Sequence, residues 1–302
     1  MAEYEFMTVD VFTARRFGGN PLAVILDARG LDDAAMQSIA AEFGYPETTF
    51  VLPPDNPQHH AKVRIFTPRA ELGFAGHPNI GTGFILAQRS EAVPEHFTFE
   101  EKSGLVRVHL ERGLHGKVTG ARVAAPHSLE LGIHVPKEVL AACVGLRPED
   151  LLLVAHPPIV ASVGLKFVIA EVSGLETLRR ASPDLAAIRA AAKRFPEAGE
   201  GFPVLLYTKL DDDATRLSVR AFAPLLGVWE DAATGSANAA LAALLTSLAP
   251  GDELALTYEI SQGSEIGRPS RIVARAHKSA DGPVLASVSG DCTPVMQGRL
   301  EV

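Results

Sequence analysis

Cysteine is nearly absent from this sequence, which contains only Cys143 and Cys292 among its 302 residues. The two lie far apart in the chain, so the sequence lacks the closely spaced cysteines of a disulfide-stabilised domain. We therefore expect two buried free thiols and a reducing, cytoplasmic setting.

Positive charge is also scarce, because 28 Lys and Arg residues stand against 36 Asp and Glu residues and give a net charge of −8. A surface of this sign repels nucleic acids and anionic membranes, so neither is an expected partner. No apolar run reaches the roughly 20 residues of a membrane-spanning helix. The first residues, MAEYEFMTVDVF, lack the basic start of a signal peptide.

Apolar residues are abundant enough to build a large core. Hydrophobic residues make up 47% of the chain and charged residues 21%, a balance typical of folded proteins and not of disordered ones. A length of 302 residues corresponds to about two domains of ordinary size.

One stretch of the chain combines a strand, a glycine-rich connection and an uncharged helix. Residues 64–87 read RIFTPRAELGFAGHPNIGTGFILA. We predict that Gly76 and His77 cap the helix and that Pro78 is its first residue, where a missing N–H has no cost. The residues that follow Pro78 carry no charge, which indicates a buried helix whose N-terminal N–H groups could receive an anion.

The same pattern occurs a second time, in residues 220–245, which read RAFAPLLGVWEDAATGSANAALAALL. The repeat matches Arg64 with Arg220 and Gly76 with Gly235. Such a distant repeat indicates a duplicated fold of two like halves and not a short-repeat solenoid. If approximate two-fold symmetry relates the halves, both helix starts point at one cleft between domains, where a small anionic ligand could bind.

The order of the expected elements favours an α+β protein. Strands and helices mix without the strict alternation of a doubly wound sheet. The sequence predicts an N-terminal domain of residues 1–125 and a C-terminal domain of residues 126–302, and the last strand is a candidate to return to the first domain. Residues 126–136, which begin and end with proline, are the best candidate for a linker.

Several well-known functional motifs are missing. The glycines that follow Gly76 resemble a phosphate-binding loop, but the required lysine is absent, so nucleotide hydrolysis is not expected. The sequence has no G-x-G-x-x-G after a strand, no G-x-S-x-G and no H-E-x-x-H. The ten histidines are scattered, so we expect no metal site.

Five polar residues remain as candidates at the ends of buried elements. Glu47, at the start of the expected strand ETTFVL, is either a general acid/base or a solvated carboxylate. Asp231 either serves a site or caps the turn that follows it. His77 and Ser236 hold matching places after the motif glycines, as caps or as pocket residues, and Asn20 is a turn residue or a ligand contact.

The whole set of motifs resembles one enzyme family. The segments VDVFTARRFGGNPLAVIL, PETTFVLPP, GFAGHP, EDAATGSA and QGSEIGRPS are similar, in this order, to those of the PhzF-type phenazine-biosynthesis isomerases. The resemblance implies the diaminopimelate-epimerase fold, in which two pseudo-symmetric α+β domains each wrap a curved sheet around a central helix. It also implies isomerisation of a small carboxylate without cofactor or metal, usually in a homodimer.

The resemblance further assigns roles to residues that match the family motifs. Glu47 would remove a proton from a substrate carbon and return it elsewhere, as in trans-2,3-dihydro-3-hydroxyanthranilate isomerase, and His77 and Asp231 would assist. A free glutamate, with a pKa of about 4.3, is a poor acid at neutral pH, and enclosure from water would raise that pKa. The residues expected to bind substrate are Asn20, Gly76, Gly235 and Ser236.

Two other functions are compatible with such a fold. An amino-acid epimerase or racemase of this fold uses one cysteine at each helix start, and neither motif contains a cysteine. A non-catalytic protein that binds a small carboxylate would show saturable binding without hydrogen exchange at carbon.

Overall fold

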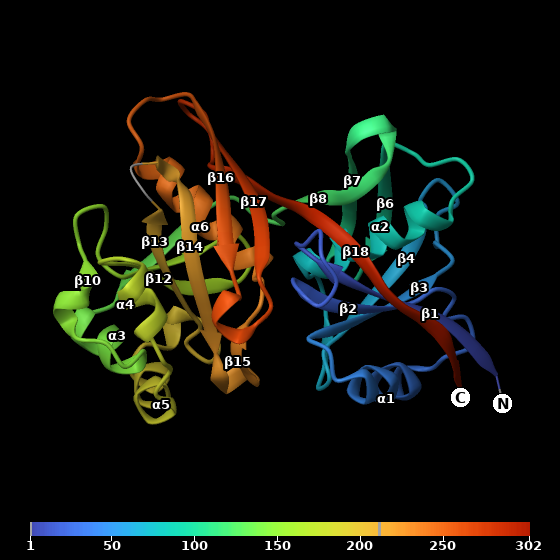
Figure 1. The fold of residues 1–302 in the computed structure, drawn as a ribbon, viewed down its shortest axis with the longest axis horizontal. Helices are drawn as coiled ribbons and strands as arrows, with labels where there is room; N and C mark the ends of the chain where they lie inside the picture. Colours follow the sequence, from blue (N-terminus) through green and yellow to red (C-terminus); the bar gives the residue numbers. More distant parts are fainter. Residues whose placement is uncertain (1, 211–212) are drawn as a thin grey trace. The chain divides into compact units, whose positions relative to one another are not determined.

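The computed structural model describes residues 2–210 and 213–302. These residues form two compact units, the first made of residues 1–124 with 289–302 and the second of residues 125–288. The sequence-based division was 1–125 and 126–302, with the last strand a candidate for the first domain. Figure 1 shows the course of the chain through both units.

The first unit is a mixed sheet that closes on itself. Its strands are β1 (Glu3–Val11), β2 (Asn20–Ile25), β3 (Glu47–Leu52), β4 (Ala61–Phe66), β5 (Glu71–Leu72), β6 (His96–Glu101), β7 (Gly104–Arg112), β8 (Val118–Ala124) and most of β18 (Leu285–Glu301). β2 and β3 are parallel, as are β4 and β6. The antiparallel pairs are β1 with β2 and β18, β4 with β3 and β5, and β7 with β6 and β8. Because β18 pairs with both β1 and β8, the sheet has no free edge there.

Helix α2 (Gly76–Arg89) lies inside this curved sheet, whereas α1 (Asp33–Phe43) lies outside it (Figure 1). α2 packs against β1, β2, β3, β7 and β8. Glycine allows the close approach, because a Cβ at Gly81 would lie 2.6 Å from Leu22 Cδ2 and one at Gly83 would lie 2.7 Å from Val108 Cγ1. The uncharged helix is buried, as predicted.

The second unit is built around α6 (Gly235–Leu248), which packs against β11, β12, β16 and β17. Its strands are β9 (Glu130–His134), β10 (Leu151–Leu152), β11 (Ile159–Ser162), β12 (Lys166–Val172), β13 (Val204–Leu210), β14 (Asp213–Ala223), β15 (Val228–Asp231), β16 (Leu254–Gln262) and β17 (Ser270–Lys278). Its other helices are α3 (Lys137–Cys143), α4 (Leu175–Arg180) and α5 (Leu185–Arg194).

The two units repeat one strand arrangement. In the second, β12 and β13 are parallel, β14 is antiparallel to β13, and β16 is parallel to β14. The first unit has the same relations among β2, β3, β4 and β6. The predicted α+β class and the duplication are therefore confirmed.

Two local predictions were wrong. The helix starts at Gly76 with Ala75 as its N-cap, so His77 and Pro78 lie in the first turn and not at the cap and first position. The expected linker, residues 126–136, contains β9, which pairs with β11. Backbone pairing holds this strand although most of its side chains are exposed.

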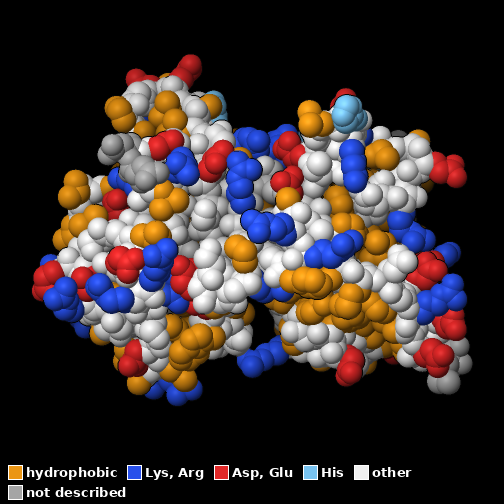
Figure 2. Space-filling model, in the orientation of Figure 1, with side chains coloured by type: hydrophobic (Ala, Val, Ile, Leu, Met, Phe, Trp, Pro, Cys, Tyr) orange, Lys and Arg blue, Asp and Glu red, His pale blue; other side chains and the backbone are white. Residues whose placement is uncertain are grey.

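The surface and the cysteines agree with the composition. Figure 2 shows acidic and basic side chains interspersed on the face in view, without a large patch of positive charge. Cys143 and Cys292 are both free and buried, as predicted. Over residues 2–210 and 213–302, no helix is long and apolar enough to cross a membrane.

Candidate functional site

Three of the candidate residues lie close together in the first unit because of strand register and helix packing. Asn20 and Glu47 are the first residues of the parallel strands β2 and β3, and Glu47 is the register partner of Leu22. A buried hydrogen bond of 2.8 Å between Thr49 and Thr82 joins β3 to α2. These contacts hold the start of β3 beside the start of α2.

Glu47 and His77 contact each other directly. His77 Nε2 lies 3.3 Å from Glu47 Oε2, and the two side chains are 7% and 16% exposed. Burial lowers the pKa of His77 to about 3, and a hydrogen bond to the Pro21 carbonyl opposes this only in part. The ring is therefore neutral at neutral pH, so this contact is not an ion pair.

The hydrogen bond to Pro21 also fixes the tautomer of His77. A neutral imidazole has one N–H donor and one acceptor nitrogen, and its bond to a carbonyl must use the donor. Nε2 makes no hydrogen bond within the described part of the chain, so Nδ1 is the donor. His77 therefore presents the lone pair of Nε2 to Glu47, an arrangement suited to receiving a hydrogen bond from a protonated carboxyl group.

The second unit has its own cluster at the start of α6. The Thr234 hydroxyl donates a 2.7 Å hydrogen bond to Asp231 Oδ2, so Asp231 does brace the turn before the helix. Gly235 is the first residue of α6 and is buried, and Ser236 follows it half-buried. Gly76 has the same place in α2. The two clusters belong to different units.

Sequence reasoning missed Gln262, the last residue of β16, which is 1% exposed. Its amide group donates to the Asp231 carbonyl and the Thr234 hydroxyl and accepts from Asn238 Nδ2 and the Thr234 N–H. Asn238 was also missed, although the duplication could have revealed it. Asn238 and Asn79 both lie three residues after a motif glycine, and each donates to its own helix's N-cap carbonyl.

A buried ion pair positions the strand that carries Asp231. Arg220 Nη2 lies 2.6 Å from Glu230 Oε2, and Arg220 Nε donates to Glu230 Oε1 at 2.9 Å. The two side chains are 8% and 5% exposed. Because Glu230 directly precedes Asp231 in β15, this bidentate pair fixes the end of that strand against β14.

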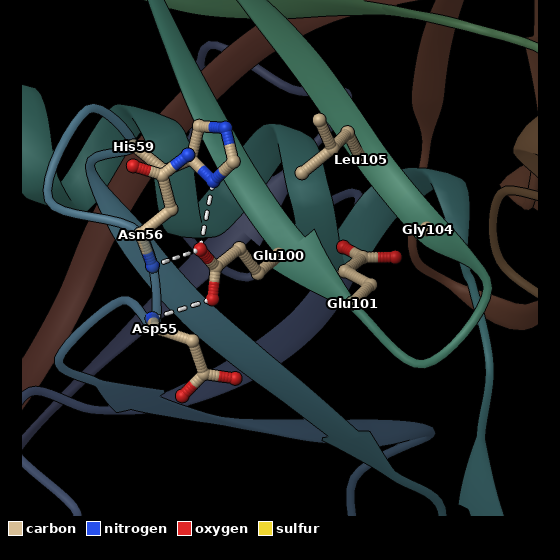
Figure 3. Close-up of a pocket in the computed structure, with 7 residues that line it drawn as sticks. All are labelled: Asp55, Asn56, His59, Glu100, Glu101, Gly104 and Leu105. Atoms are coloured by element: carbon tan, nitrogen blue, oxygen red, sulfur yellow. Dashed lines mark hydrogen bonds and ion pairs between the residues drawn. The ribbon is translucent and has the colours of Figure 1, made fainter.

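A surface pocket of about 390 Å³ in the first unit contains none of the candidate residues. It is lined by Asp55, Asn56, His59, Glu100, Glu101, Gly104 and Leu105 (Figure 3). Among residues 2–210 and 213–302, no group of three or more His, Cys, Asp or Glu side chains could hold a metal ion.

The chain has relatives that cover nearly all of its length. Residues 9–298 match the PhzC-PhzF family, described as phenazine biosynthesis-like protein. An uncharacterized isomerase of Mesorhizobium japonicum, mll1393, is 38% identical over 99% of both chains. The trans-2,3-dihydro-3-hydroxyanthranilate isomerase of Pseudomonas aeruginosa is 34% identical over 98% of this chain and 99% of its own.

Solved structures have the same architecture. The crystal structure of a phenazine biosynthesis protein of the PhzF family from Bacillus anthracis matches with a TM-score of 0.87 and 25% identity, over 100% of both chains. The architecture is therefore the diaminopimelate-epimerase-like fold expected from the motifs. The chain is an isomerase that belongs to the PhzC-PhzF family of phenazine biosynthesis-like proteins.

Proposed function

We propose that the protein is a cofactor-independent isomerase that moves a proton between two carbons of a small carboxylate, with Glu47 as general acid and base. The observation that supports this best is the contact between Glu47 Oε2 and His77 Nε2, at 3.3 Å. A neutral imidazole places no positive charge beside the carboxyl group, so Glu47 can hold a proton as well as release one.

The proposed step conserves atoms and electrons. Glu47 as a carboxylate takes a proton from one substrate carbon, and the C–H electron pair enters the adjoining double-bond system. Glu47 as a carboxylic acid then returns the proton to another carbon of that system. The Nε2 lone pair of His77 accepts a hydrogen bond from the protonated carboxyl group and orients it between the two half-steps.

We assign the remaining candidates to substrate binding. The starts of α2 and α6 carry backbone N–H groups without intrahelical partners, and such groups favour a carboxylate. Gly76 and Gly235 begin these helices, so no side chain at either position stands in the way of an anion. Asn20 and Ser236 would add polar contacts, and Asp231 would assist the movement of protons.

The substrate class is a cyclic hydroxy amino acid. The name of the relative from Pseudomonas aeruginosa gives one such compound, trans-2,3-dihydro-3-hydroxyanthranilate. Pro46 precedes Glu47, so this chain offers no side-chain hydroxyl to substrate at that place. We also propose that the protein is a cytoplasmic homodimer. Size-exclusion chromatography with light scattering would measure the mass of this dimer.

The experiment follows hydrogen exchange at carbon. The protein is incubated in D₂O with trans-2,3-dihydro-3-hydroxyanthranilate and a panel of cyclic β-hydroxy amino acids, and NMR records the loss of C–H signals. We expect Glu47→Gln to keep the fold and to slow exchange by about 10²–10⁴-fold, the usual contribution of general acid/base catalysis. Glu42→Gln, on the exposed side of α1, is the matched control with no expected effect.

Each outcome separates the candidate functions. Exchange that Glu47→Gln slows by about 10²–10⁴-fold and that Glu42→Gln leaves unchanged supports the proposal. Full exchange in Glu47→Gln contradicts the role of Glu47. Saturable binding of a panel member by the wild-type protein without exchange favours the binding protein, and inversion at a single carbon favours the epimerase.

A further inference from the structure

Glu101 occupies the place in the first unit that Gln262 occupies in the second. Glu101 ends β6, which is parallel to β4, and Gln262 ends β16, which is parallel to β14. Both lie beside the asparagine of the central helix, Asn79 or Asn238. The duplication therefore matches an acid in one unit with an amide in the other.

The Gln262 amide joins three segments because it both donates and accepts hydrogen bonds. Nε2 donates to the Asp231 carbonyl and the Thr234 hydroxyl, and Oε1 accepts from Asn238 Nδ2. These bonds hold the start of α6 against the end of β16. An ionised carboxylate could only accept, so it could not replace both halves of this bonding.

The Asn79 amide can donate one N–H to Glu101, which leaves the other buried carboxyl oxygen of Glu101 without a donor when Glu101 is ionised. Both Glu101 oxygens and Asn79 Oδ1 are buried without a hydrogen bond of ordinary geometry in the described part of the chain. Asn79 Nδ2 already donates to the Ala75 carbonyl, at 3.0 Å. A proton on that other oxygen would remove the buried charge and let Glu101, like the Gln262 amide, both donate and accept.

We infer that Glu101 is protonated in the folded protein and acts as the acid counterpart of Gln262, a positioning residue that braces the start of α2. The start of α2 carries Gly76 and His77, which belong to the site of the proposed function. The effect of Glu101 on catalysis therefore rests on the proposed function, whereas its effect on stability does not. Burial supports the assignment, because it raises the pKa of Glu101 to about 8, and the Asn79 amide opposes that shift less strongly.

Charged groups on the surrounding elements are engaged elsewhere. They are Glu100 on β6, Lys62 on β4, Glu71 on β5, Lys102 in the β6–β7 turn and His77 on α2. The Glu100 carboxylate accepts from backbone N–H groups of the 55–56 loop and contacts His59, and Figure 3 shows the Glu101 carboxyl group directed away from that loop. Lys102 Nζ lies 3.5 Å from Glu71 Oε2, and the partner of Glu101 on β7 is the uncharged Gly104.

The test compares the pH dependence of unfolding in the wild-type chain and in Glu101→Gln, Glu101→Leu and Glu100→Gln. Because the pKa of Glu101 is raised on folding, the folded state holds a proton that the unfolded state has released between pH 4.5 and 8. The wild-type folding constant should therefore fall, relative to that of Glu101→Gln, by about tenfold per pH unit in this window. Glu100→Gln should keep the wild-type slope.

A second readout separates the brace from mere burial of an acid. Glu101→Gln should leave the imidazole NMR signals of His77 and the rate of C–H exchange unchanged. In this variant both should also stay unchanged above pH 8. Glu101→Leu should remove the pH slope but shift the His77 signals and slow exchange.

Equal pH slopes in the wild type and Glu101→Gln would overturn the protonation of Glu101. Identical His77 signals in Glu101→Gln and Glu101→Leu would overturn the brace. If the His77 signals separate the two variants but no panel compound exchanges, the brace stands and the proposed function fails.

Discussion

Replacing Arg220 with alanine removes the cation that holds β15 in place. Its guanidinium bonds both oxygens of Glu230, at 2.6 and 2.9 Å, and neither side chain is more than 8% exposed. The same group donates to three backbone carbonyls at the end of α4, those of Leu178, Arg179 and Ala181. The substitution therefore leaves a buried carboxylate without its partner and removes a donor from three carbonyls, of which that of Leu178 keeps the Ala181 N–H.

The structure contains a matched control for this substitution. Arg64 holds the equivalent place in the first unit and contacts Glu71, but these side chains are 21% and 20% exposed and its second partner, Asp33, is 84% exposed. Breaking a buried pair by removing one partner costs about 3–5 kcal/mol, whereas exposed pairs contribute about 0–1 kcal/mol. The Arg64–Glu71 pair is half-buried and lies between these limits, so we expect Arg220→Ala to destabilise the protein by about 1–3 kcal/mol more than Arg64→Ala.

Urea unfolding followed by fluorescence measures this difference directly. Trp229 is the single tryptophan of the chain and lies beside Glu230 in β15, so its emission reports the segment that Arg220 holds. Circular dichroism follows the whole chain in parallel. Replacing both Arg220 and Glu230 with methionine should recover part of the loss, because no buried charge remains. Equal costs for Arg220→Ala and Arg64→Ala would refute the reasoning.

Two further substitutions test the packing of α2 and the protonation of its histidine. Gly81→Ala should destabilise the protein by about 1–3 kcal/mol in urea unfolding, because the new methyl group would lie 2.6 Å from Leu22 Cδ2, whereas Gln88→Ala on the exposed face should be nearly neutral. His77 should not titrate by NMR between pH 5 and 8. Because its pKa is lowered on folding to about 3, the unfolded state binds a proton that the folded state does not, so stability is lost as pH falls below about 6.5. The stability of His77→Gln should lack this one-proton pH dependence. Titration of His77 near pH 6.5 in the folded protein would contradict the lowered pKa.

Local sequence signals predicted those helices and strands whose ends are set by nearby residues. The strand Glu47–Leu52 has the predicted bounds because Gly44 ends the preceding helix with φ of 63° and Pro46 forces an extended chain. The burial of α2 follows from its lack of charge. Its start was misplaced because capping rules identify side-chain caps, and Ala75 has none.

Local sequence signals could not predict which strands pair when they lie far apart in the chain. The sequence ELGIH of β9 does alternate, with apolar Leu131 and Ile133, but its place in the sheet depends on pairing with β11. The last strand is a predicted candidate for the first domain, but the sequence does not predict its partners: β18 pairs with β1 across almost 300 residues, as in Glu3 and Glu301, and also with β8. Gln262 and Glu101 were missed for the same reason, because their contacts with the central helices exist only in the folded chain.

Matched positions in the two halves carry the same residue type where the residue is structural, and different residue types where a chemical role is proposed. The matched pairs that agree are Arg64 and Arg220, Glu71 and Glu230, and Asn79 and Asn238. The matched pairs that differ are Glu47 and Pro203, Leu72 and Asp231, and His77 and Ser236. A racemase with two opposed bases needs like groups from both halves. Glu47 has no acidic counterpart at its matched position, which suits the proposed reaction, in which a single residue both removes the proton and returns it.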